Sequence, residues 1–443
     1  MDQHNYNQKK RPPVKRKPPV RRKKNNAAVY LIIAAAVILS ALCIILIVHH
    51  AKSTGTKNAG SSSGTKTTVS QTTSAAKAST ATVLSTGDVL IHKEIFTNAK
   101  TSDGSYDFNY CFEYAKNTIS AADYAVCNLE VTLADGTSGY SFYPFFQVPD
   151  SIVTALKNAG FDMCVTANNH SGDGGASGLT RTVKVTRAAG LATTGTKETA
   201  SEKNYKVVDV NGIKIGMIDY TFAKITDDGR VSLNGNAAMS ADESACINAF
   251  DYDRLDAFYS AMKTNIANMK KDGAEAVMLY IHWGTEYSTA QSEVQEQIAQ
   301  KMCDLGVDVI IGGHPHVIEP VDVLTNSSGH KTVCLYSDGN LLSNQRTKYM
   351  SDKSGHTEDG IFFYTTFKKD TKGKVTLASV SYVPTWVNYY SKGGKTYHQI
   401  VPLSDLSDPS ALGLGNTVNG AALAQASKDR TDALVAAGAK KFA

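Results

Sequence analysis

The sequence predicts a layered α/β domain over residues 81–403. Runs of β-branched and apolar residues alternate with amphipathic runs in the first part of this region, and this alternation is typical of strands covered by helices. After Pro320 the pattern changes mainly to strands, so we expect one sheet to pack on another. A chain of 443 residues is long enough to bury a large core of this kind.

The strands and helices of this domain follow from local patterns. Runs rich in Val, Ile, Thr and aromatic residues predict strands, and apolar residues spaced three and four apart predict helices. Asn211-Gly212 lies between two strand-like runs and predicts a hairpin. The predicted strands are residues 82–86, 124–129, 163–166, 205–210, 213–220, 276–281, 307–311, 321–324, 332–336, 361–367 and 375–383, and the predicted helices are residues 107–122, 150–159, 175–189, 253–271, 290–305 and 421–441.

The region before the domain predicts a membrane anchor. Residues 1–26 hold ten Lys and Arg and one acidic residue, whereas the whole chain is only +5, so the remainder is net negative. Residues 27–49 contain no Asp, Glu, Lys or Arg and are long enough to cross a bilayer core of about 30 Å. This run exceeds the hydrophobic core of a cleaved signal peptide, which is the alternative interpretation. We therefore expect a single-pass anchor with a cytoplasmic N-terminus and an extracellular domain.

Three further features complete this organisation. Beside a membrane span, the basic tail is expected to set orientation and contact anionic lipid rather than nucleic acid. Residues 50–80 are mainly Ser, Thr, Ala, Gly and Lys and predict a flexible linker, and residues 404–443 predict a peripheral helical extension. The cysteines after the span are scattered without C-x-x-C pairs, which predicts buried free thiols and argues against a thiolate zinc site.

Metal-type side chains follow five predicted strands. Taken singly each signal is weak, because a lone Asp after a strand is often a helix cap and Asn-Asn often marks a turn. Ligands gather beyond the carboxyl ends of strands in open α/β sheets, however, and five of the eleven histidines fall in these segments. The segments are STGDVLIH with Asp88 and His92, CNLE with Glu130, TANNHSGD with Asn168, Asn169, His170 and Asp173, YIHWGTE with His282 and Glu286, and GGHPHV with His314 and His316.

This donor set of imidazole, carboxylate and amide suits Mn, Fe or Zn. The candidate ligands are too many for one tetrahedral ion, and a carboxylate is able to bridge two. Two divalent ions about 3.5–4 Å apart would bind phosphoryl oxygens and lower the pKa of a bridging water. The alternative for the HPH segment is a polar loop with two solvated histidines.

The ordered motifs GD, NLE, ANNH, HWGTEY, GGHPHV and YSDGN resemble the bacterial capsule-synthesis family of the CapA or PgsA type, the poly-γ-glutamate capsule proteins. That family is itself similar to the calcineurin-like metallophosphoesterases. The resemblance spans residues 84–386 and implies a metallophosphoesterase-like α/β/β/α sandwich. It also implies a membrane-anchored external domain.

Carried over residue by residue, the resemblance implies a dinuclear metal site. Asp88 would bind one metal and Glu130 would bridge, although the phosphoesterases use Asp at the bridging position. His170 would be the general acid that protonates the leaving oxygen. The family's first histidine comes two residues after Asp, so His92, four residues after, departs from the pattern. The remaining ligands would be Asn169, His282 and His314 for the second metal and His316 for the first.

Supporting roles are predicted for a second group of residues. Asn168 is a candidate beside the ligands, and Asp173 is expected to cap the helix that follows it. Glu286 is expected to orient His282 or another ligand. Asp338 and Asn340 end another strand and suit either a turn or a contact with substrate. The aromatic run at residues 140–146 predicts a covered hydrophobic loop or, as the alternative, a rim against substrate.

Two functions follow from this reasoning. The first is an extracellular metal-dependent hydrolase that acts on a cell-envelope substrate in the synthesis, export or attachment of an anionic polymer of the poly-γ-glutamate type. The second is a non-catalytic subunit that binds the polymer or membrane synthetase subunits. The motif residues favour the enzyme, whereas the departures at Glu130 and His92 favour the scaffold.

Overall fold

The computed structural model describes residues 78–442, which belong to one compact unit. The predicted basic tail, the membrane span at residues 27–49 and nearly all of the linker lie outside the described residues. Within residues 78–442, no helix is both long and apolar enough to cross a membrane.

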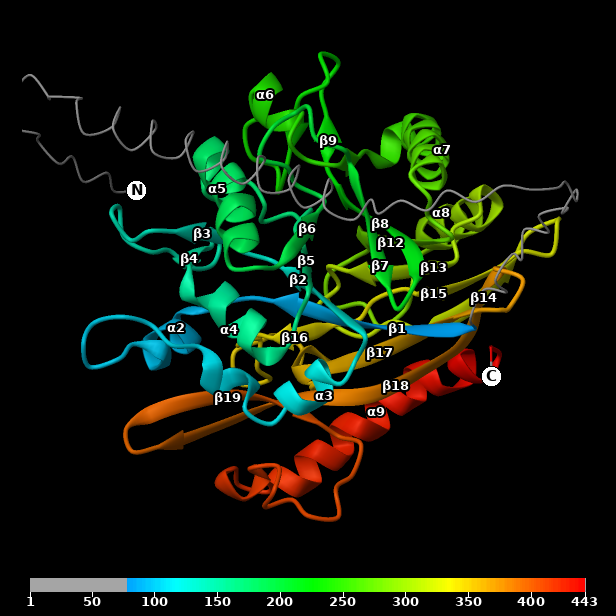
Figure 1. Ribbon diagram of the computed structural model, residues 1–443. Helices are drawn as coiled ribbons and strands as arrows, with labels where there is room; N and C mark the ends of the chain where they lie inside the picture. The colour runs from blue at the N-terminus through cyan, green and yellow to red at the C-terminus, as the bar shows by residue number, and fades with distance from the viewer. Residues whose placement is uncertain (1–77, 443) are drawn as a thin grey trace, which may run out of the picture. The chain divides into compact units, whose positions relative to one another are not determined.

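The first sheet is mixed and carries the N-terminal strand at its centre (Figure 1). Its order is β19-β18-β17-β1-β2-β5-β6, with β16 also paired to β1. The run from β1 to β6 is parallel, and β17, β18 and β19 are antiparallel. The strands are β1 (Ser79–Val89), β2 (Tyr124–Leu129), β5 (Met163–Val165), β6 (Ala192–Thr194), β16 (Asn340–Leu342), β17 (Asp359–Lys369), β18 (Val375–Lys392) and β19 (Lys395–Pro402).

The second large sheet has the order β11-β8-β12-β13-β15-β14, with β7 paired to β8. Strands β7 and β8 form the hairpin predicted at Asn211-Gly212, where both residues have positive φ (53° and 81°) as a type I′ turn requires. The strands are β7 (Tyr205–Val210), β8 (Ile213–Phe222), β11 (Ala249–Phe250), β12 (Ala276–His282), β13 (Val309–Gly313), β14 (Val321–Thr325) and β15 (Lys331–Leu335), and the short strands β3 (Thr132–Ala134), β4 (Gln147–Pro149), β9 (Lys224–Ile225) and β10 (Val231–Ser232) form two small ribbons.

Helices cover the outer faces of both sheets (Figure 1). Apolar residues of α2 and α4 join one core cluster with the first sheet, and those of α7 and α8 join another with the second sheet. The helices are α2 (Lys93–Ala99), α3 (Lys116–Ser120), α4 (Ser151–Ala159), α5 (Gly175–Ala188), α6 (Ala241–Ser244), α7 (Leu255–Lys271), α8 (Glu293–Leu305) and α9 (Gly420–Lys440), with single 3₁₀ turns at Asn109–Phe112, Tyr252–Arg254, His356–Glu358 and Leu414–Asn416.

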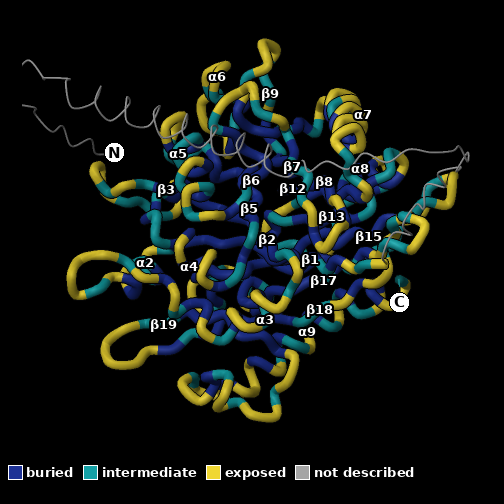
Figure 2. The backbone as a smooth tube through the Cα atoms, in the orientation of Figure 1, coloured by how far each residue is buried: buried dark blue, intermediate teal, exposed yellow. Residues whose placement is uncertain are grey.

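The two sheets share a third core cluster between them. It joins Val83 and Phe363 of the first sheet to Met217, Met278 and Leu335 of the second, all fully buried. Figure 2 shows this buried interior along the strands, with exposed residues on the loops and outer helix faces. The arrangement is a four-layer α/β/β/α sandwich. The parallel strands bring their carboxyl ends to one edge of each sheet, as the predicted site requires.

One prediction of secondary structure and one prediction of packing are wrong. Residues 107–122 do not form one helix but a 3₁₀ turn at Asn109–Phe112 followed by the short helix α3, and Asp107 accepts the backbone N–H of Asn109 just before the turn. The C-terminal helix α9 is not peripheral. It packs on β14, β17 and β18, and its Val435 is fully buried in the core between the sheets. The amphipathic pattern showed a helix but not which surface it covers.

The six cysteines of the described region are free and buried, as predicted. Cys127 and Cys164 lie on neighbouring strands with their Sγ atoms 3.8 Å apart. Burial raises the pKa of the Cys127 thiol well above its usual range, which keeps it protonated.

Candidate metal centre

The first sheet supplies two carboxylates at the ends of its central strands. Asp88 lies at a bulge near the end of β1, and Glu130 follows β2 directly. Gly87 allows this bulge, because a Cβ there would lie 1.9 Å from the carbonyl oxygen of Gly339. Both carboxylates are fully buried. Asn128 joins them, since its Nδ2 donates to Asp88 Oδ1 at 2.7 Å and to Glu130 Oε2 at 3.3 Å.

The second sheet supplies three imidazoles opposite these carboxylates. His282 is the last residue of β12, and His314 and His316 follow β13 in the HPH segment. The backbones of His314 and His316 have φ of 95° and 58°, an uncommon conformation for residues other than glycine that clusters at functional sites. The rings of His282 and His314 lie with centroids 4.8 Å apart.

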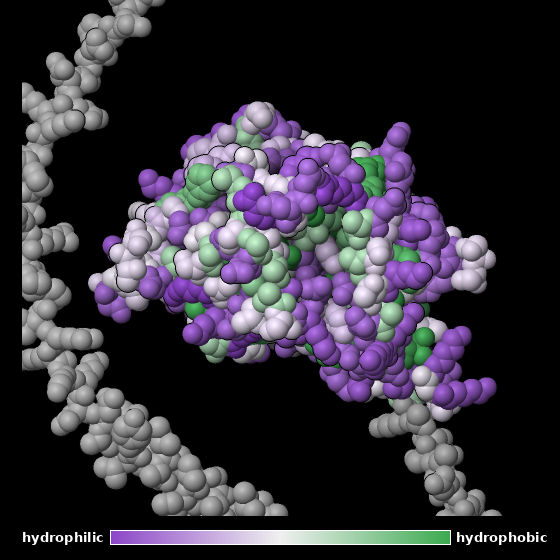
Figure 3. Space-filling view, turned by 90° about the horizontal axis from the view of Figure 1, so that it is seen from above, coloured by the Kyte–Doolittle hydropathy of each residue, from purple (hydrophilic) through white to green (hydrophobic). Residues whose placement is uncertain are grey.

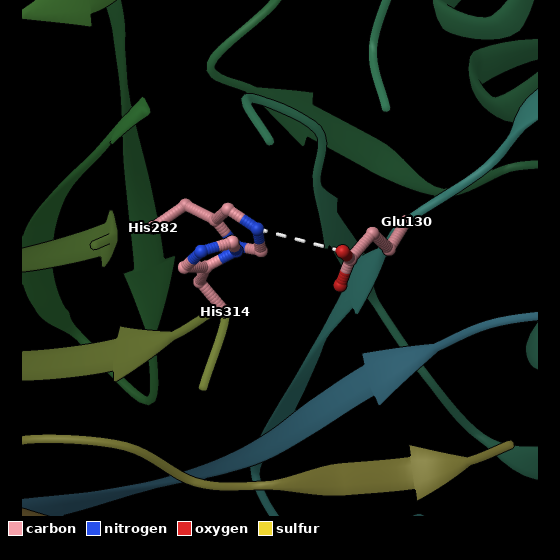
Figure 4. Close-up of side chains that lie close together, drawn as sticks. All are labelled: Glu130, His282 and His314. Atoms are coloured by element: carbon pink, nitrogen blue, oxygen red, sulfur yellow. Dashed lines mark ion pairs between the residues drawn. The ribbon is translucent and has the colours of Figure 1, made fainter. Parts of the chain in front are cut away.

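Five of these side chains form two overlapping groups with metal-ligand spacing. Asp88, Glu130 and His316 form one group, and Glu130, His282 and His314 form the other. Figure 4 shows Glu130 pointing from the end of β2 toward the imidazoles of His282 and His314. Glu130 Oε1 lies 3.5 Å from His282 Nε2 and 3.9 Å from His316 Nε2. Glu130 therefore occupies the shared position predicted for a bridging carboxylate.

The buried charges of these groups strongly affect one another. Burial and the nearby Asp88 raise the pKa of Glu130 well above its usual range. Burial lowers the pKa of His316, but Glu130 and the hydrogen bond to Asp88 (3.0 Å from His316 Nδ1 to Oδ2) raise it to about 9. Burial lowers the pKa of His282 to about 4. Without a cation, Asp88 and Glu130 thus cannot both ionise, and the imidazole of His282 remains neutral.

The donor set fits a cation at this position. Glu130 Oε1 and His314 Nδ1 are buried without a hydrogen-bond partner. Buried polar atoms in native structures nearly always have a partner, and a bound metal ion would satisfy both atoms at once. Imidazole and carboxylate ligands without thiolate are suited to Mn, Fe or Zn.

Asn169 also faces this centre. Its Oδ1 lies 2.9 Å from His282 Nε2, while its Nδ2 donates to Asn234 Oδ1 at 3.1 Å. Asn234 in turn donates to the backbone oxygen of Asn169 at 3.0 Å. This reciprocal pair fixes the orientation of the amide, so its oxygen is the atom directed at the metal-type ligands.

His170 lies beside Asn169 and is paired with Asp173. The distance from His170 Nδ1 to Asp173 Oδ2 is 2.8 Å, and the same oxygen accepts the backbone N–H of Phe146 at 2.6 Å. The ring of Phe146 meets that of His170 edge to face. Asp173 therefore orients His170, and the prediction that it caps α5 is wrong, since α5 has no side-chain cap.

Two of the predicted residues, the ligand candidate His92 and the supporting residue Glu286, belong to neither ligand group. His92 belongs to neither group, and it precedes α2, where its Nδ1 accepts the backbone N–H of Asn344 at 3.2 Å. His92 lies outside both groups but near them, since its pKa is lowered by burial and also by the charges of His316 and His170. Glu286 is exposed, and no hydrogen bond joins it to His282 within the described residues.

The other predicted supporting residues are buried beside the site. Asn168 donates to Asn128 Oδ1 and Leu129 O, both at 3.0 Å, which ties the NNH loop to β2. Asn340 donates to the backbone oxygen of His316 at 3.1 Å and so supports the HPH turn. The Oδ1 atom of Asp338 is buried without a partner.

Three residues of this centre were not among the predicted site residues. Asn128 and Asn234 are described above, and the third is Asp219 of β8, whose Oδ2 accepts the backbone N–H groups of Thr166 and Ala167 at 2.9 and 2.7 Å. A single Asp within an apolar strand was the available signal for Asp219. Asp88 and Asn168 lie 40 positions from Asn128, and Asn169 lies 65 positions from Asn234, which concealed the roles of the two asparagines.

The aromatic run at residues 140–146 is covered in part, as predicted, and a rim against substrate stays a prediction. Phe146 is buried against His170, and the rings of Tyr140 and Phe142 contact Phe96. Tyr143 remains 75% exposed. On the face of the molecule seen in Figure 3, hydrophobic residues form small separate patches among hydrophilic ones.

Comparisons with known proteins show which proteins this chain is similar to. A family model described as bacterial capsule synthesis protein PGA_cap matches residues 82–345. The capsule biosynthesis protein CapA of Bacillus anthracis is 28% identical over 286 residues, 63% of this chain and 64% of the relative. The PGA biosynthesis protein CapA of Bacillus subtilis (strain 168) is 29% identical over 266 residues, 58% of this chain and 62% of the relative. The chain thus spans less than two thirds of either relative.

A comparison with solved structures finds the NAD nucleotidase NadN of Haemophilus influenzae. It matches with a TM-score of 0.41 and 13% identity, covering 81% of this chain and 68% of that chain.

Proposed function

Because the chain belongs to the bacterial capsule synthesis protein family PGA_cap, we propose that it is a membrane-anchored, metallophosphoesterase-like hydrolase of capsule biosynthesis. It acts outside the cell in the synthesis, export or attachment of an anionic polymer of the poly-γ-glutamate type. The names of its two relatives, which refer to capsule and PGA biosynthesis, support this setting. The uncharged segment at residues 27–49 supports the anchor, and membrane synthetase subunits are the proposed partners.

The position of Glu130 in both ligand groups carries the proposal of a dinuclear centre. Asp88, Glu130 and His316 would hold one divalent ion of Mn, Fe or Zn. Glu130, His282 and His314 would hold the second, together with Asn169 Oδ1. Such a pair of ions stabilises charge on phosphoryl oxygens and lowers the pKa of a coordinated water.

His170 is the proposed general acid. The Nδ1–H group of His170 donates a hydrogen bond to Asp173 Oδ2 at 2.8 Å, which leaves Nε2 as the atom that would donate to the leaving oxygen of the substrate. The Phe146 ring restricts rotation of the imidazole and excludes water from one side of it. The chain thereby holds one proton ready at a defined atom next to the metal ligands.

The test measures metal content and turnover on the full-length protein, purified without a polyhistidine tag. We expect about two metal ions per chain in the wild type after loading with Mn, Fe or Zn, and fewer than one in Glu130→Ala. His170→Ala is expected to keep its metal and to hydrolyse p-nitrophenyl phosphate or bis-p-nitrophenyl phosphate about 10²–10⁴-fold more slowly.

Three results would contradict this function. A wild type that binds no metal would exclude metal-dependent hydrolysis. Loss of metal in His170→Ala would make that residue a ligand instead of an acid. A metal-loaded protein that hydrolyses neither phosphoesters nor glutamyl polymers, yet binds the polymer, would favour a non-catalytic subunit. The displacement of His92 from the ligand groups is the observation that favours this second function.

A further inference from the structure

A small cavity lies beside the metal centre, between the ends of β2, β12 and β13. Its volume is about 20 Å³, which is enough for one water molecule. Most of its walls are strand backbone and apolar side chains. Its polar lining comprises Thr86, Asn128, Tyr280, His282 and Asp338.

The absence of a side chain at Gly313 creates this space. A Cβ on Gly313 would lie 3.1 Å from Asp88 Oδ1 and 3.6 Å from both Asp338 Oδ1 and His282 Nδ1. His282 and Asp338 line the cavity, and Asp88 Oδ1 lies against the same position at Gly313. Asp338 is 4% exposed, and its Oδ1 has no hydrogen-bond partner. A buried acceptor of this kind destabilises the fold unless a donor reaches it.

The Nδ1 atom of His282 needs an acceptor in this cavity. Its other nitrogen, Nε2, faces Asn169 Oδ1 at 2.9 Å and Glu130 Oε1 at 3.5 Å, so Nε2 is the ligand atom. A neutral imidazole that binds metal through Nε2 carries its proton on Nδ1.

Asn128 cannot accept a hydrogen bond from Nδ1–H of His282. Asn128 Nδ2 lies 3.5 Å from His282 Nδ1. That atom is itself a donor, and it is already directed at Asp88 Oδ1 and Glu130 Oε2. The Oδ1 atom of Asn128 accepts from Asn168, which fixes the orientation of the amide.

We propose that one buried water links His282 Nδ1–H to Asp338 and Asp88, which makes Asp338 a positioning residue for the metal ligand His282. The water accepts from Nδ1–H and donates to Asp338 Oδ1 and Asp88 Oδ1, so it makes three hydrogen bonds, the usual number for a buried water. A carboxyl oxygen accepts in either protonation state of Asp338. The bridge fixes the tautomer and ring orientation of His282, as carboxylates behind metal-bound histidines do. This inference rests on the metal binding included in the proposed function.

The test compares zinc affinity, by competition with a chromogenic chelator, in the full-length wild type and three variants. Asp338→Asn keeps an acceptor oxygen at the same place, Asp338→Leu removes it, and Gly313→Ala fills the cavity from the opposite side. Gly313 does not have positive φ, so Ala fits its backbone. We expect Asp338→Leu and Gly313→Ala to bind zinc about 10–100-fold more weakly, and Asp338→Asn to bind as the wild type does.

A second measurement reports the tautomer directly. In zinc-loaded protein with ¹⁵N-labelled histidine, long-range ¹H–¹⁵N spectra identify the protonated nitrogen of His282, assigned through His282→Gln. We expect the proton on Nδ1 in the wild type and in Asp338→Asn, and a mixture of tautomers or ring orientations in Asp338→Leu. The spectrum is informative even where a variant is less stable.

Several outcomes would overturn the bridge. Unchanged zinc affinity in both Asp338→Leu and Gly313→Ala would do so, as would equal weakening by Asp338→Asn and Asp338→Leu. A proton on Nε2 in the zinc-loaded wild type would show that Nδ1 is the ligand atom and also refute it. A wild type that binds zinc but hydrolyses no phosphoester refutes the proposed function alone, whereas one that binds no zinc overturns both.

Discussion

Asp219 holds the start of the loop that carries Asn169 and His170, and its removal is expected to loosen that loop. The side chain is 2% exposed, and its Oδ2 accepts the N–H groups of Thr166 and Ala167. Its environment is tight, because a Cβ at Gly195 (φ 102°) would lie 2.2 Å from Oδ2. A substitution that deletes the carboxyl therefore affects backbone groups only two to four residues from the proposed metal ligand and acid.

The expected magnitude follows from the hydrogen bonds that are lost in Asp219→Ala. Thr166 N–H retains a hydrogen bond to the backbone oxygen of Thr194 at 3.0 Å, whereas Ala167 N–H loses its acceptor, Asp219 Oδ2. A buried N–H without a partner costs about 1–3 kcal/mol. A cost of about 2 kcal/mol corresponds to local opening about 30-fold more frequent.

Hydrogen exchange of the Ala167 amide measures this opening, and zinc affinity measures its effect on the site. Burial raises the pKa of Asp219 well above its usual range, so the neutral Asp219→Asn is the matched control. It retains an oxygen that is able to accept both N–H groups, and its exchange rate is expected to match the wild type. If Asp219→Ala also exchanges at the wild-type rate and binds zinc normally, the carboxyl does not support the loop.

Three further predictions concern single side chains. Burial raises the pKa of Glu319 to about 7, so the folded state binds this proton more tightly than the unfolded chain, and stability falls as pH rises from about 4.5 to 7. Glu319→Gln should therefore be about 3 kcal/mol more stable than wild type at pH 8 and equal to it at pH 4. Urea unfolding curves that differ equally at both pH values would contradict this. His92→Ala should retain full metal content by elemental analysis, because His92 lies outside both ligand groups, and loss of an ion would return it to the ligand set. Asp173→Asn should lower phosphoester turnover about 10²-fold while KM and metal content stay the same, since the substitution weakens the contact that orients His170. Unchanged turnover would show that Asp173 only accepts the backbone N–H of Phe146.

The sequence predicted the layered fold and most residues of the candidate metal centre because both depend on local patterns. Apolar runs predicted the central strands, and the polar residues just beyond them predicted a shared edge. Asp88, Glu130, His282, His314 and His316 lie together as expected. The alternation of side chains and the ends of strands are properties of a few consecutive residues, so the sequence carries them directly. The anchor, the polymer and the number of metal ions remain predictions.

Only the tertiary structure decided how these residues divide into roles. Asp88 and His316 are 228 positions apart, and no local pattern states that their side chains meet at 3.0 Å. Long separation in sequence likewise concealed the partners of Asp219 and Asn234. His92 shows the converse, because its side chain is close to Asp88 in sequence but contacts Asn344 instead. Side-chain direction depends on packing between the two sheets, which the spacing of residues along one strand does not determine.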